Sequence, residues 1–247
     1  MGTITILPET TKNPISLIGR RAGICWGSDV ESDSKNYKRG LACINSGHGR
    51  VLEFVNIETV IDGYSARVIR EWYTHIGGSP TRLQASTRYI NYNDFDYIIP
   101  NTIKTIKQEN EYREAMRSIK ESTVKLMELG VPKEDVANLL PLGMATKIVD
   151  KRNLRNVIDM SRQRMCNRAY WEFRQMFTDY INALGEISEE WEYVVETQMK
   201  PKCDVYGKCS EAKSCGRLSK KKETDTYDGD KKGIVEYGVK REDNDDG

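Results

Sequence analysis

The segment from Thr74 to Tyr89 constrains the fold more than any other part of this chain. Its sixteen positions hold one histidine, two arginines, two glycines and one proline, together with several hydroxyl and amide side chains. A segment so rich in hydrogen-bonding groups has little apolar surface to bury, so it predicts a loop between the apolar-rich stretches on either side. Glycines let a backbone approach a ligand closely, and arginines hold phosphate or carbonyl groups through paired hydrogen bonds. The segment therefore favours a loop that wraps an anionic, planar ligand such as a nucleotide.

Length and charge set the broad class of protein. The chain has 247 residues, which is enough for one domain with a substantial core. Its 38 lysines and arginines nearly balance its 37 acidic residues, for a net charge of +1. General nucleic-acid binders and membrane-surface binders usually carry a basic excess, so this balance favours neither class.

Hydropathy and cysteine content indicate the compartment. The mean hydropathy is −0.64 and no long apolar run occurs, so we expect no membrane span. The N-terminus lacks the basic start and apolar stretch of a secretory signal, and we expect a cytoplasmic protein. Cys203, Cys209 and Cys215 are evenly spaced, but no Cys-x-x-Cys pair and no nearby histidine accompany them. This spacing favours ordinary thiols over a zinc site, and no metal is expected.

Residue patterns predict a mixture of strands and helices. Alternating β-branched residues predict strands over 3–7, 55–61 and 142–149. Helical spacing predicts helices over 64–73, 102–129, 132–140 and 153–184. The strands do not alternate regularly with the helices, which indicates an α+β fold. We expect one domain over residues 1–217, and a polar, disordered tail over 218–247 that has few apolar groups to bury.

Other features restrict how a nucleotide could bind. No Gly-x-Gly-x-x-Gly follows a strand and no P-loop is present, so a nucleotide or flavin would not bind in the Rossmann manner. Asn153, Val157, Met160 and Arg164 are offset by four, three and four residues, which places them along one face of the predicted helix. An amide and a guanidinium on that face could reach one pocket, although a helix with solvated arginines has the same local pattern.

Several segments together resemble the signature motifs of the flavin-dependent (alternative) thymidylate synthases. The end of that family's signature loop, Ser-x-Arg-Tyr, is present at residues 86–89, and the signature histidine is His75. Thr74 and Ile76 replace the arginines that flank this histidine in most of the family. Residues 46–53 are similar to the family's His-Gly-x-x-x-Glu stretch, and residues 140–164 to its Leu-Pro, Asn-x-Arg and later arginine. The resemblance covers roughly residues 45–217.

The resemblance implies a set of site residues. It assigns dUMP binding to Ala85, Ser86, Thr87, Arg88 and Arg164. It assigns FAD binding to Arg50, His75, Arg82, Gln84, Asn153, Arg155 and Asp159. Arg164 is the expected catalytic residue, because a guanidinium facing the pyrimidine stabilises negative charge as the ring is activated. Asp159 stands where the family usually has an asparagine, and Ala137 where some members have an arginine.

The resemblance also implies a fold and a reaction. The expected fold is the α+β architecture of this family, with long helices and a mixed or antiparallel sheet, assembled as a homotetramer whose active sites are shared between subunits. The expected reaction is reductive methylation of dUMP to dTMP, with methylenetetrahydrofolate as carbon donor, FAD as hydride source and NADPH as reductant. Two alternatives remain open at this point: a folate-dependent pyrimidine nucleotide hydroxymethylase, and a non-catalytic relative that binds flavin or nucleotide.

Overall fold

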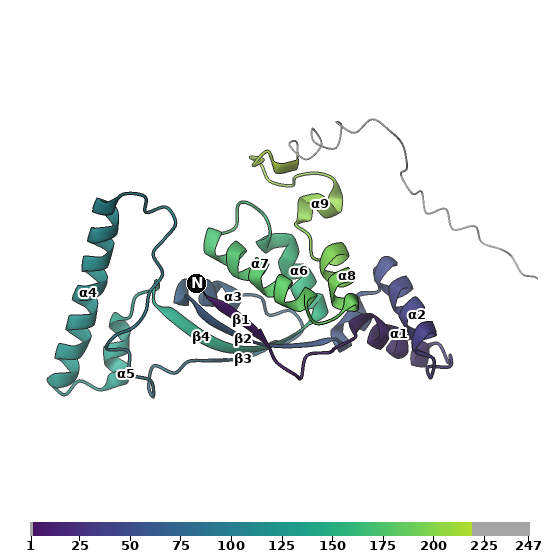
Figure 1. Ribbon diagram of the computed structural model, residues 1–247, viewed down its shortest axis with the longest axis horizontal. Helices are drawn as coiled ribbons and strands as arrows, with labels where there is room; N and C mark the ends of the chain where they lie inside the picture. Colours follow the sequence, from purple (N-terminus) through teal and green to yellow (C-terminus); the bar gives the residue numbers. More distant parts are fainter. Residues whose placement is uncertain (1, 219–247) are drawn as a thin grey trace, which may run out of the picture.

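A four-stranded antiparallel sheet forms the centre of the protein, in a computed structural model that describes residues 2–218 (Figure 1). The polar tail expected over 218–247 lies, apart from its first residue, outside the described residues. The strands are β1 (Thr3–Ile6), β2 (Asn56–Ser65), β3 (Thr81–Gln84) and β4 (Ala145–Asn153), in the order β1-β2-β4-β3. The expected α+β class is confirmed, and the sheet is antiparallel throughout.

Helices cover one face of this sheet (Figure 1). They are α3 (Ala66–Trp72), α6 (Leu154–Arg164), α7 (Trp171–Gly185) and α8 (Glu189–Gln198). Strand alternation explains this packing, because inward side chains such as Ile57, Ile61 and Ile148 are fully buried while their neighbours are not. An aromatic cluster fills the space between sheet and helices: Trp72, Phe173, Phe177 and Tyr180.

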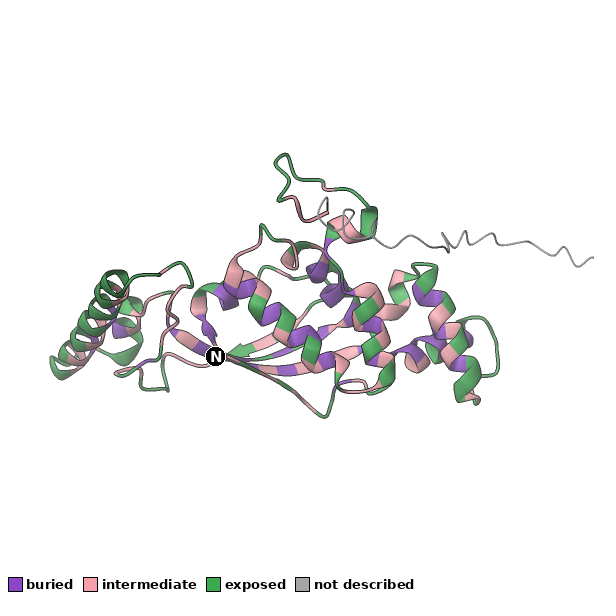
Figure 2. Cartoon of the chain, turned by 45° about the horizontal axis from the view of Figure 1, so that its top comes forward, coloured by how far each residue is buried: buried purple, intermediate pink, exposed green. Residues whose placement is uncertain are grey.

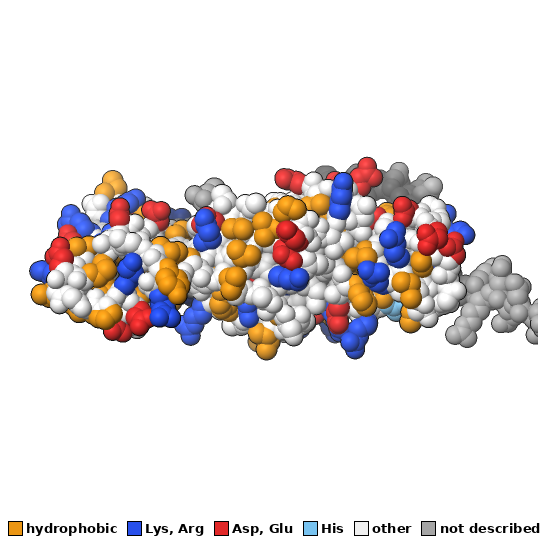
Figure 3. Space-filling view, turned by 90° about the horizontal axis from the view of Figure 1, so that it is seen from below, with side chains coloured by type: hydrophobic (Ala, Val, Ile, Leu, Met, Phe, Trp, Pro, Cys, Tyr) orange, Lys and Arg blue, Asp and Glu red, His pale blue; other side chains and the backbone are white. Residues whose placement is uncertain are grey.

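The opposite face of the sheet has no helix of the described residues over it (Figure 1), and hydrophobic side chains lie among charged ones on that side (Figure 3). Val60 pairs with Val149, and Val149 pairs with Leu83, so these three form an apolar row across the sheet. Ion pairs flank the row at Lys147–Asp62 and Lys151–Glu58. One face of the sheet is therefore a core and the other an amphipathic surface.

Helix α9 (Lys202–Tyr206) follows α8 and packs near α6, and the remaining helices lie at the two ends of the sheet (Figure 1). At one end are α1 (Pro14–Cys25), α2 (Asp33–Asn45) and the short 3₁₀ helix η1 (Gly49–Phe54). At the other are α4 (Ile106–Glu128), α5 (Lys133–Val136) and the 3₁₀ turn η2 (Ala137–Leu139). Helix α4 buries only Met116 and Thr123, and most of its surface is exposed (Figure 2). Of the described helices, none has the length and apolar character needed to cross a membrane.

Several elements differ from the sequence-based expectations. The strand expected over 55–61 continues to Ser65 as β2, into the range 64–73 that was expected to be helical. The single helix expected over 153–184 is two helices, α6 and α7, joined by a turn at residues 165–170. The strand expected over 142–149 begins and ends later, as β4. The segment 74–89, expected to be a loop, contains the short strand β3 at the edge of the sheet. A short, mostly polar strand is typical of a sheet edge, where one side of the strand pairs with no other strand.

Candidate active site

Arg164, at the last position of α6, contacts the loop that follows α3. Its Nε donates a hydrogen bond of 2.8 Å to Nε2 of His75, and its Nη1 donates one of 3.0 Å to Glu71. The guanidinium also lies 4.5 Å from the centre of the Phe173 ring. These three partners fix the plane of the guanidinium, and no residue in the described range 2–218 forms a hydrogen bond with its Nη2. Sequence reasoning placed His75 and Arg164 in a site but missed Glu71 and Phe173.

The His75 imidazole is neutral in this arrangement. Burial, followed by the positive charges of Arg164 and Arg152, lowers the pKa of His75 to about 4. Because Nε2 accepts the hydrogen bond from Arg164, the single ring proton lies on Nδ1. A protonated imidazole could not accept that bond, so the position of Arg164 depends on a neutral His75.

A buried ion pair lies beneath this loop. Asp150 and Arg152 lie on the inward face of β4, with both side chains 0% exposed and two hydrogen bonds of 2.5 and 2.8 Å between them. The indole N–H of Trp72 donates to Asp150 at 2.9 Å, and Arg152 donates to Asn156 at 2.6 Å. The guanidinium also stacks on the Trp72 ring at 4.2 Å. The pair links strand β4, helix α3 and the start of α6 into one rigid support.

Sequence reasoning missed this support for a specific reason. The predicted strand ended at residue 149, so Asp150 and Arg152 fell outside the alternating pattern. Had the alternation been continued, Thr146, Ile148, Asp150 and Arg152 would have shared one face. Two opposite charges at successive inward positions are the signal that could have found them.

The two glycines of the loop lie against the start of α6. Gly78 has a φ of +73°, and a Cβ at this position would lie 2.1 Å from Nδ2 of Asn153. Asn153 is the N-cap of α6, since its side chain accepts a 2.9 Å hydrogen bond from the N–H of Asn156. Asn153 and Arg164, at opposite ends of α6, thus both contact the loop over 74–89. The side-chain oxygen of Asn153 is therefore already engaged inside the chain.

Arg50 and Arg155 form a second cluster around Glu53. Arg155 donates to Glu53 at 2.6 Å, and Arg50 lies 3.7 Å from the same carboxylate. The Arg50 side chain is 86% exposed. Gly49 leaves room for the Arg155 guanidinium, which would lie 3.4 Å from a Cβ at that position. Two guanidiniums on neighbouring elements carry the positive charge and hydrogen-bond donors that commonly bind phosphates, so their chemistry fits the diphosphate of the expected FAD.

Three more of the expected flavin residues make contacts within the chain. Arg82 donates to the carbonyl of Tyr73 at 3.0 Å and stacks on the Tyr73 ring at 4.5 Å. Gln84 donates to Thr146 at 3.4 Å across the β3–β4 pair. Asp159 forms an exposed ion pair with Arg162 at 3.4 Å, one helical turn away. These contacts hold Arg82 and Gln84 along the sheet edge and leave Asp159 on the outer surface of α6.

The expected dUMP residues of the loop form a third cluster. The N–H of Ala85 donates to Lys147 at 2.8 Å, and the Ser86 hydroxyl accepts from the N–H of Arg88 at 3.2 Å. Arg88 forms a 2.8 Å ion pair with Glu134 of α5. Thr87 lines a small cavity with Ala137 and Leu140. Within the described part of the chain, no hydrogen bond or ion pair joins this cluster to Arg164.

Three cysteines after α8 lie close to Arg164, at the C-terminal end of α6. Cys166, Cys203, Cys209 and Cys215 line one pocket, and each is a free thiol. Among residues 2–218, no group of three or more histidine, cysteine or acidic side chains is placed to hold a metal ion.

Comparison with known proteins identifies the class to which this fold and site belong. A model of the family described as thymidylate synthase complementing protein (Thy1) matches residues 6–188. The chain therefore belongs to this family, which confirms the resemblance to flavin-dependent thymidylate synthases.

Curated relatives and solved structures agree with that assignment. A protein named flavin-dependent thymidylate synthase from Thermococcus onnurineus is 28% identical over 220 residues, which cover 83% of this chain and 88% of the relative. A protein of the same name from Pyrococcus horikoshii is 30% identical over 173 residues, covering 68% of this chain and 70% of the relative. The fold resembles thymidylate synthase X from Helicobacter pylori, crystallised with FAD and dUMP, at a TM-score of 0.63 and 18% identity. That match covers 81% of this chain and 100% of the crystallised chain.

Proposed function

We propose that this protein catalyses the reductive methylation of dUMP to dTMP, with FAD as its redox cofactor. The proposal rests on the hydrogen bond between Arg164 and His75, in a chain that belongs to the Thy1 family. A neutral histidine and a carboxylate orient the guanidinium and leave donors for a ligand that develops negative charge. Relatives named flavin-dependent thymidylate synthase support the same activity.

The proposed reaction balances with two co-substrates. Methylenetetrahydrofolate donates the carbon, FAD when reduced supplies the hydride, and NADPH provides the electrons that reduce the flavin. Because the hydride does not come from the folate, the folate leaves as tetrahydrofolate. The chain's own residues bind, orient and polarise the reactants, since the redox step belongs to the cofactor.

Each expected site residue has a proposed role. Arg164 stabilises negative charge on the activated pyrimidine, and Glu71 and His75 orient it. Residues 85–88 bind the dUMP phosphate through backbone, hydroxyl and guanidinium donors. Arg50 and Arg155 hold the FAD diphosphate. The remaining expected flavin residues shape its site through the contacts described above: His75, Arg82, Gln84, Asn153 and Asp159.

We propose a homotetramer with active sites shared between subunits. The proposal is supported by the separate contacts of the expected dUMP residues: Arg88 pairs with Glu134 of α5 and Arg164 with Glu71 of α3, and no hydrogen bond or ion pair among the described residues joins the two sets. A second subunit that presents its residues 85–88 to Arg164 would complete the site. We assign the catalytic domain to residues 1–217 and the reaction to the cytoplasm.

The test is the mass of the nucleotide formed from dUMP. Purified protein is given FAD, NADPH and methylenetetrahydrofolate under anaerobic conditions, and the nucleotide is analysed by mass spectrometry. We expect a product with one added methyl group. Unchanged dUMP, or a hydroxymethylated product, would contradict the proposed reaction.

A further inference from the structure

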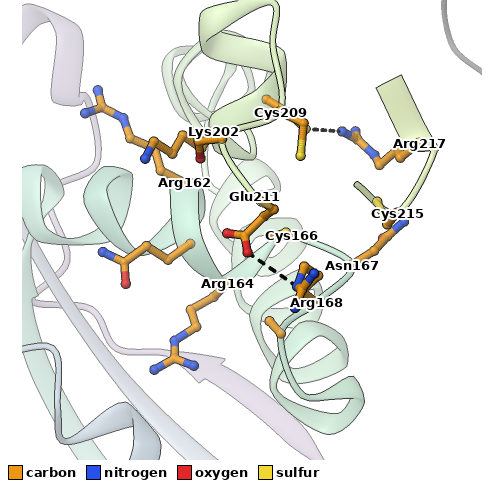
Figure 4. Close-up of a pocket in the computed structure, with 14 residues that line it drawn as sticks. Arg162, Arg164, Cys166, Asn167, Arg168, Lys202, Cys209, Glu211, Cys215 and Arg217 are labelled. Carbon is orange, nitrogen blue, oxygen red and sulfur yellow. Dashed lines mark hydrogen bonds and ion pairs between the residues drawn. The ribbon is translucent and has the colours of Figure 1, made fainter. Parts of the chain in front are cut away.

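A basic pocket of about 450 Å³ lies next to Arg164, between the end of α6, the turn after it and the tail segment 202–217 (Figure 4). The tail begins with α9 (Lys202–Tyr206) and lies beyond residue 188, where the family match ends. Glu211 is the single acidic residue in the lining, against five cationic side chains of the described chain: Arg162, Arg164, Arg168, Lys202 and Arg217. This excess of positive charge makes the pocket a candidate site for an anion.

The cations of this pocket differ in how firmly they are held. Arg217 is held by two hydrogen bonds of 2.7 and 2.8 Å to Asp204, which join the two ends of the tail segment to each other. Arg168 donates a 2.7 Å hydrogen bond from Nη1 to the carbonyl of Lys213, and its Nε forms a half-exposed ion pair of 3.4 Å with Glu211, drawn as a dashed line in Figure 4. Exposed pairs of this kind contribute only about 0–1 kcal/mol, so a ligand anion can replace the carboxylate.

Two further cations have unused hydrogen-bonding capacity. Within residues 2–218, Lys202 has no hydrogen bond or ion pair to its side chain, although it lines the pocket. The Nε of Arg162 is buried without a hydrogen-bond partner in the same described range, and the 3.4 Å contact of its Nη1 with Asp159 is exposed. A ligand with negatively charged oxygens would satisfy such donors, as arginines and lysines commonly do for phosphates and carboxylates.

We infer that this pocket binds the anionic end of a co-substrate, a phosphate or a carboxylate, while the reactive end of the same molecule lies at Arg164. The inference rests on the proposed function, because it takes Arg164 as the residue at the reacting centre. Two co-substrates of that reaction have suitable anionic ends. NADPH carries a 2′-phosphate, and a folate carries one or several glutamate carboxylates. Arg164 lines the pocket and also contacts His75, so it joins the two regions.

Equilibrium binding to the full-length, FAD-loaded protein tests the inference without requiring turnover. Isothermal titration calorimetry compares NADP⁺ with NAD⁺, and tetrahydrofolate carrying one glutamate with tetrahydrofolate carrying several. The test variant is Lys202→Glu, because the Lys202 side chain has no partner among the described residues to lose. The matched control is Lys208→Glu, an equal charge change on an exposed tail lysine outside the pocket.

We expect Lys202→Glu to lower the affinity for one anionic ligand by about 5- to 10-fold, which corresponds to roughly 1 kcal/mol of binding free energy. The affinities of Lys208→Glu should stay within about twofold of those of the wild type. Weaker binding of NADP⁺ with unchanged NAD⁺ identifies the phosphate. Weaker binding of the polyglutamate form with unchanged monoglutamate identifies the carboxylates. Wild-type affinities of Lys202→Glu for all four ligands, or an equal loss for both members of each pair, would overturn the inference.

The binding result is distinguishable from a failure of the proposed function. If the wild type forms no dTMP but binds NADP⁺ or polyglutamate through Lys202, the methylation proposal fails and the anion pocket stands. If dTMP is formed and Lys202→Glu binds every ligand normally, the pocket inference alone fails.

Discussion

Arg164 Nε and His75 Nε2 are joined by a 2.8 Å hydrogen bond although the two residues are 89 positions apart in the sequence. The bond sets both the rotation of the guanidinium and the tautomer of the imidazole. Glu71 holds the same guanidinium from α3 at 3.0 Å. A loop histidine and a helix carboxylate thus determine how the proposed catalytic arginine meets its substrate.

Replacing Arg164 with alanine should remove turnover and keep the flavin. The proposed charge stabilisation is lost, and removal of one such donor commonly lowers kcat by about 10²–10³-fold. Arg50 and Arg155, which are proposed to hold the FAD diphosphate, are untouched, so the flavin absorbance of the purified protein should not change. Arg117→Ala, on the exposed surface of α4, serves as the control. Near-normal dTMP formation by Arg164→Ala would rule out the assigned role.

The stability of the protein should fall in mildly acidic solution because of His75. Burial, with the charges of Arg164 and Arg152, lowers the pKa of His75 in the folded protein to about 4, from 6.5. Between these values the unfolded chain binds a proton that the folded chain does not, so the free energy of unfolding decreases as pH falls from 6.5 towards 4. The imidazole is partly exposed, so we expect this contribution to be about 1 kcal/mol between pH 7 and pH 5.

His75→Gln provides the comparison for that measurement. Glutamine keeps an oxygen that can accept the hydrogen bond from Arg164 but does not titrate. Urea unfolding at pH 7 and pH 5 should show that the free energy of unfolding falls more in the wild type than in the variant. Equal losses in the two proteins would show that His75 is not the titrating group.

Breaking the buried Asp150–Arg152 pair should destabilise the protein strongly. Asp150→Ala leaves an uncompensated guanidinium with 0% exposure, a change that typically costs about 3–5 kcal/mol. Asp62→Ala removes the partner of Lys147 on the exposed face of the same sheet, and should cost about 0–1 kcal/mol. Urea unfolding measures both. Similar losses in the two variants would contradict the proposed support of the loop by the buried pair.

Gly78→Ala should lower the free energy of unfolding by more than the left-handed backbone conformation at this position explains. Gly47 and Gly78 have nearly equal φ values, +71° and +73°, but a Cβ meets nothing within 4 Å at Gly47 and lies 2.1 Å from Asn153 at Gly78. Gly47→Ala should therefore show only the left-handed backbone penalty, about 1–2 kcal/mol. Gly78→Ala adds a clash with the N-cap of α6. Unfolding free energies measured side by side give the difference, and equal values would mean that the loop moves freely away from α6.

Local patterns in the sequence predicted much of the secondary structure. Helix α4 and strand β1 follow from helical spacing and alternation within their own residues. The break between α6 and α7 did not follow, because residues 165–170 contain neither glycine nor proline and the helical spacing of apolar residues continues across them. Helix ends of this kind depend on tertiary packing, which no local signal records.

The sequence by itself determined the family, the class of fold and the candidate residues, because motif order and periodicity are properties of the chain alone. Only the tertiary structure decided which of those residues meet. It joined Arg164 to His75 and Glu71, placed Arg88 with Glu134 in a separate cluster, and buried Asp150 and Arg152 beneath the loop. Contacts across long sequence separations are set by the packing of helices against the sheet, and the identity of a residue does not specify its distant partner.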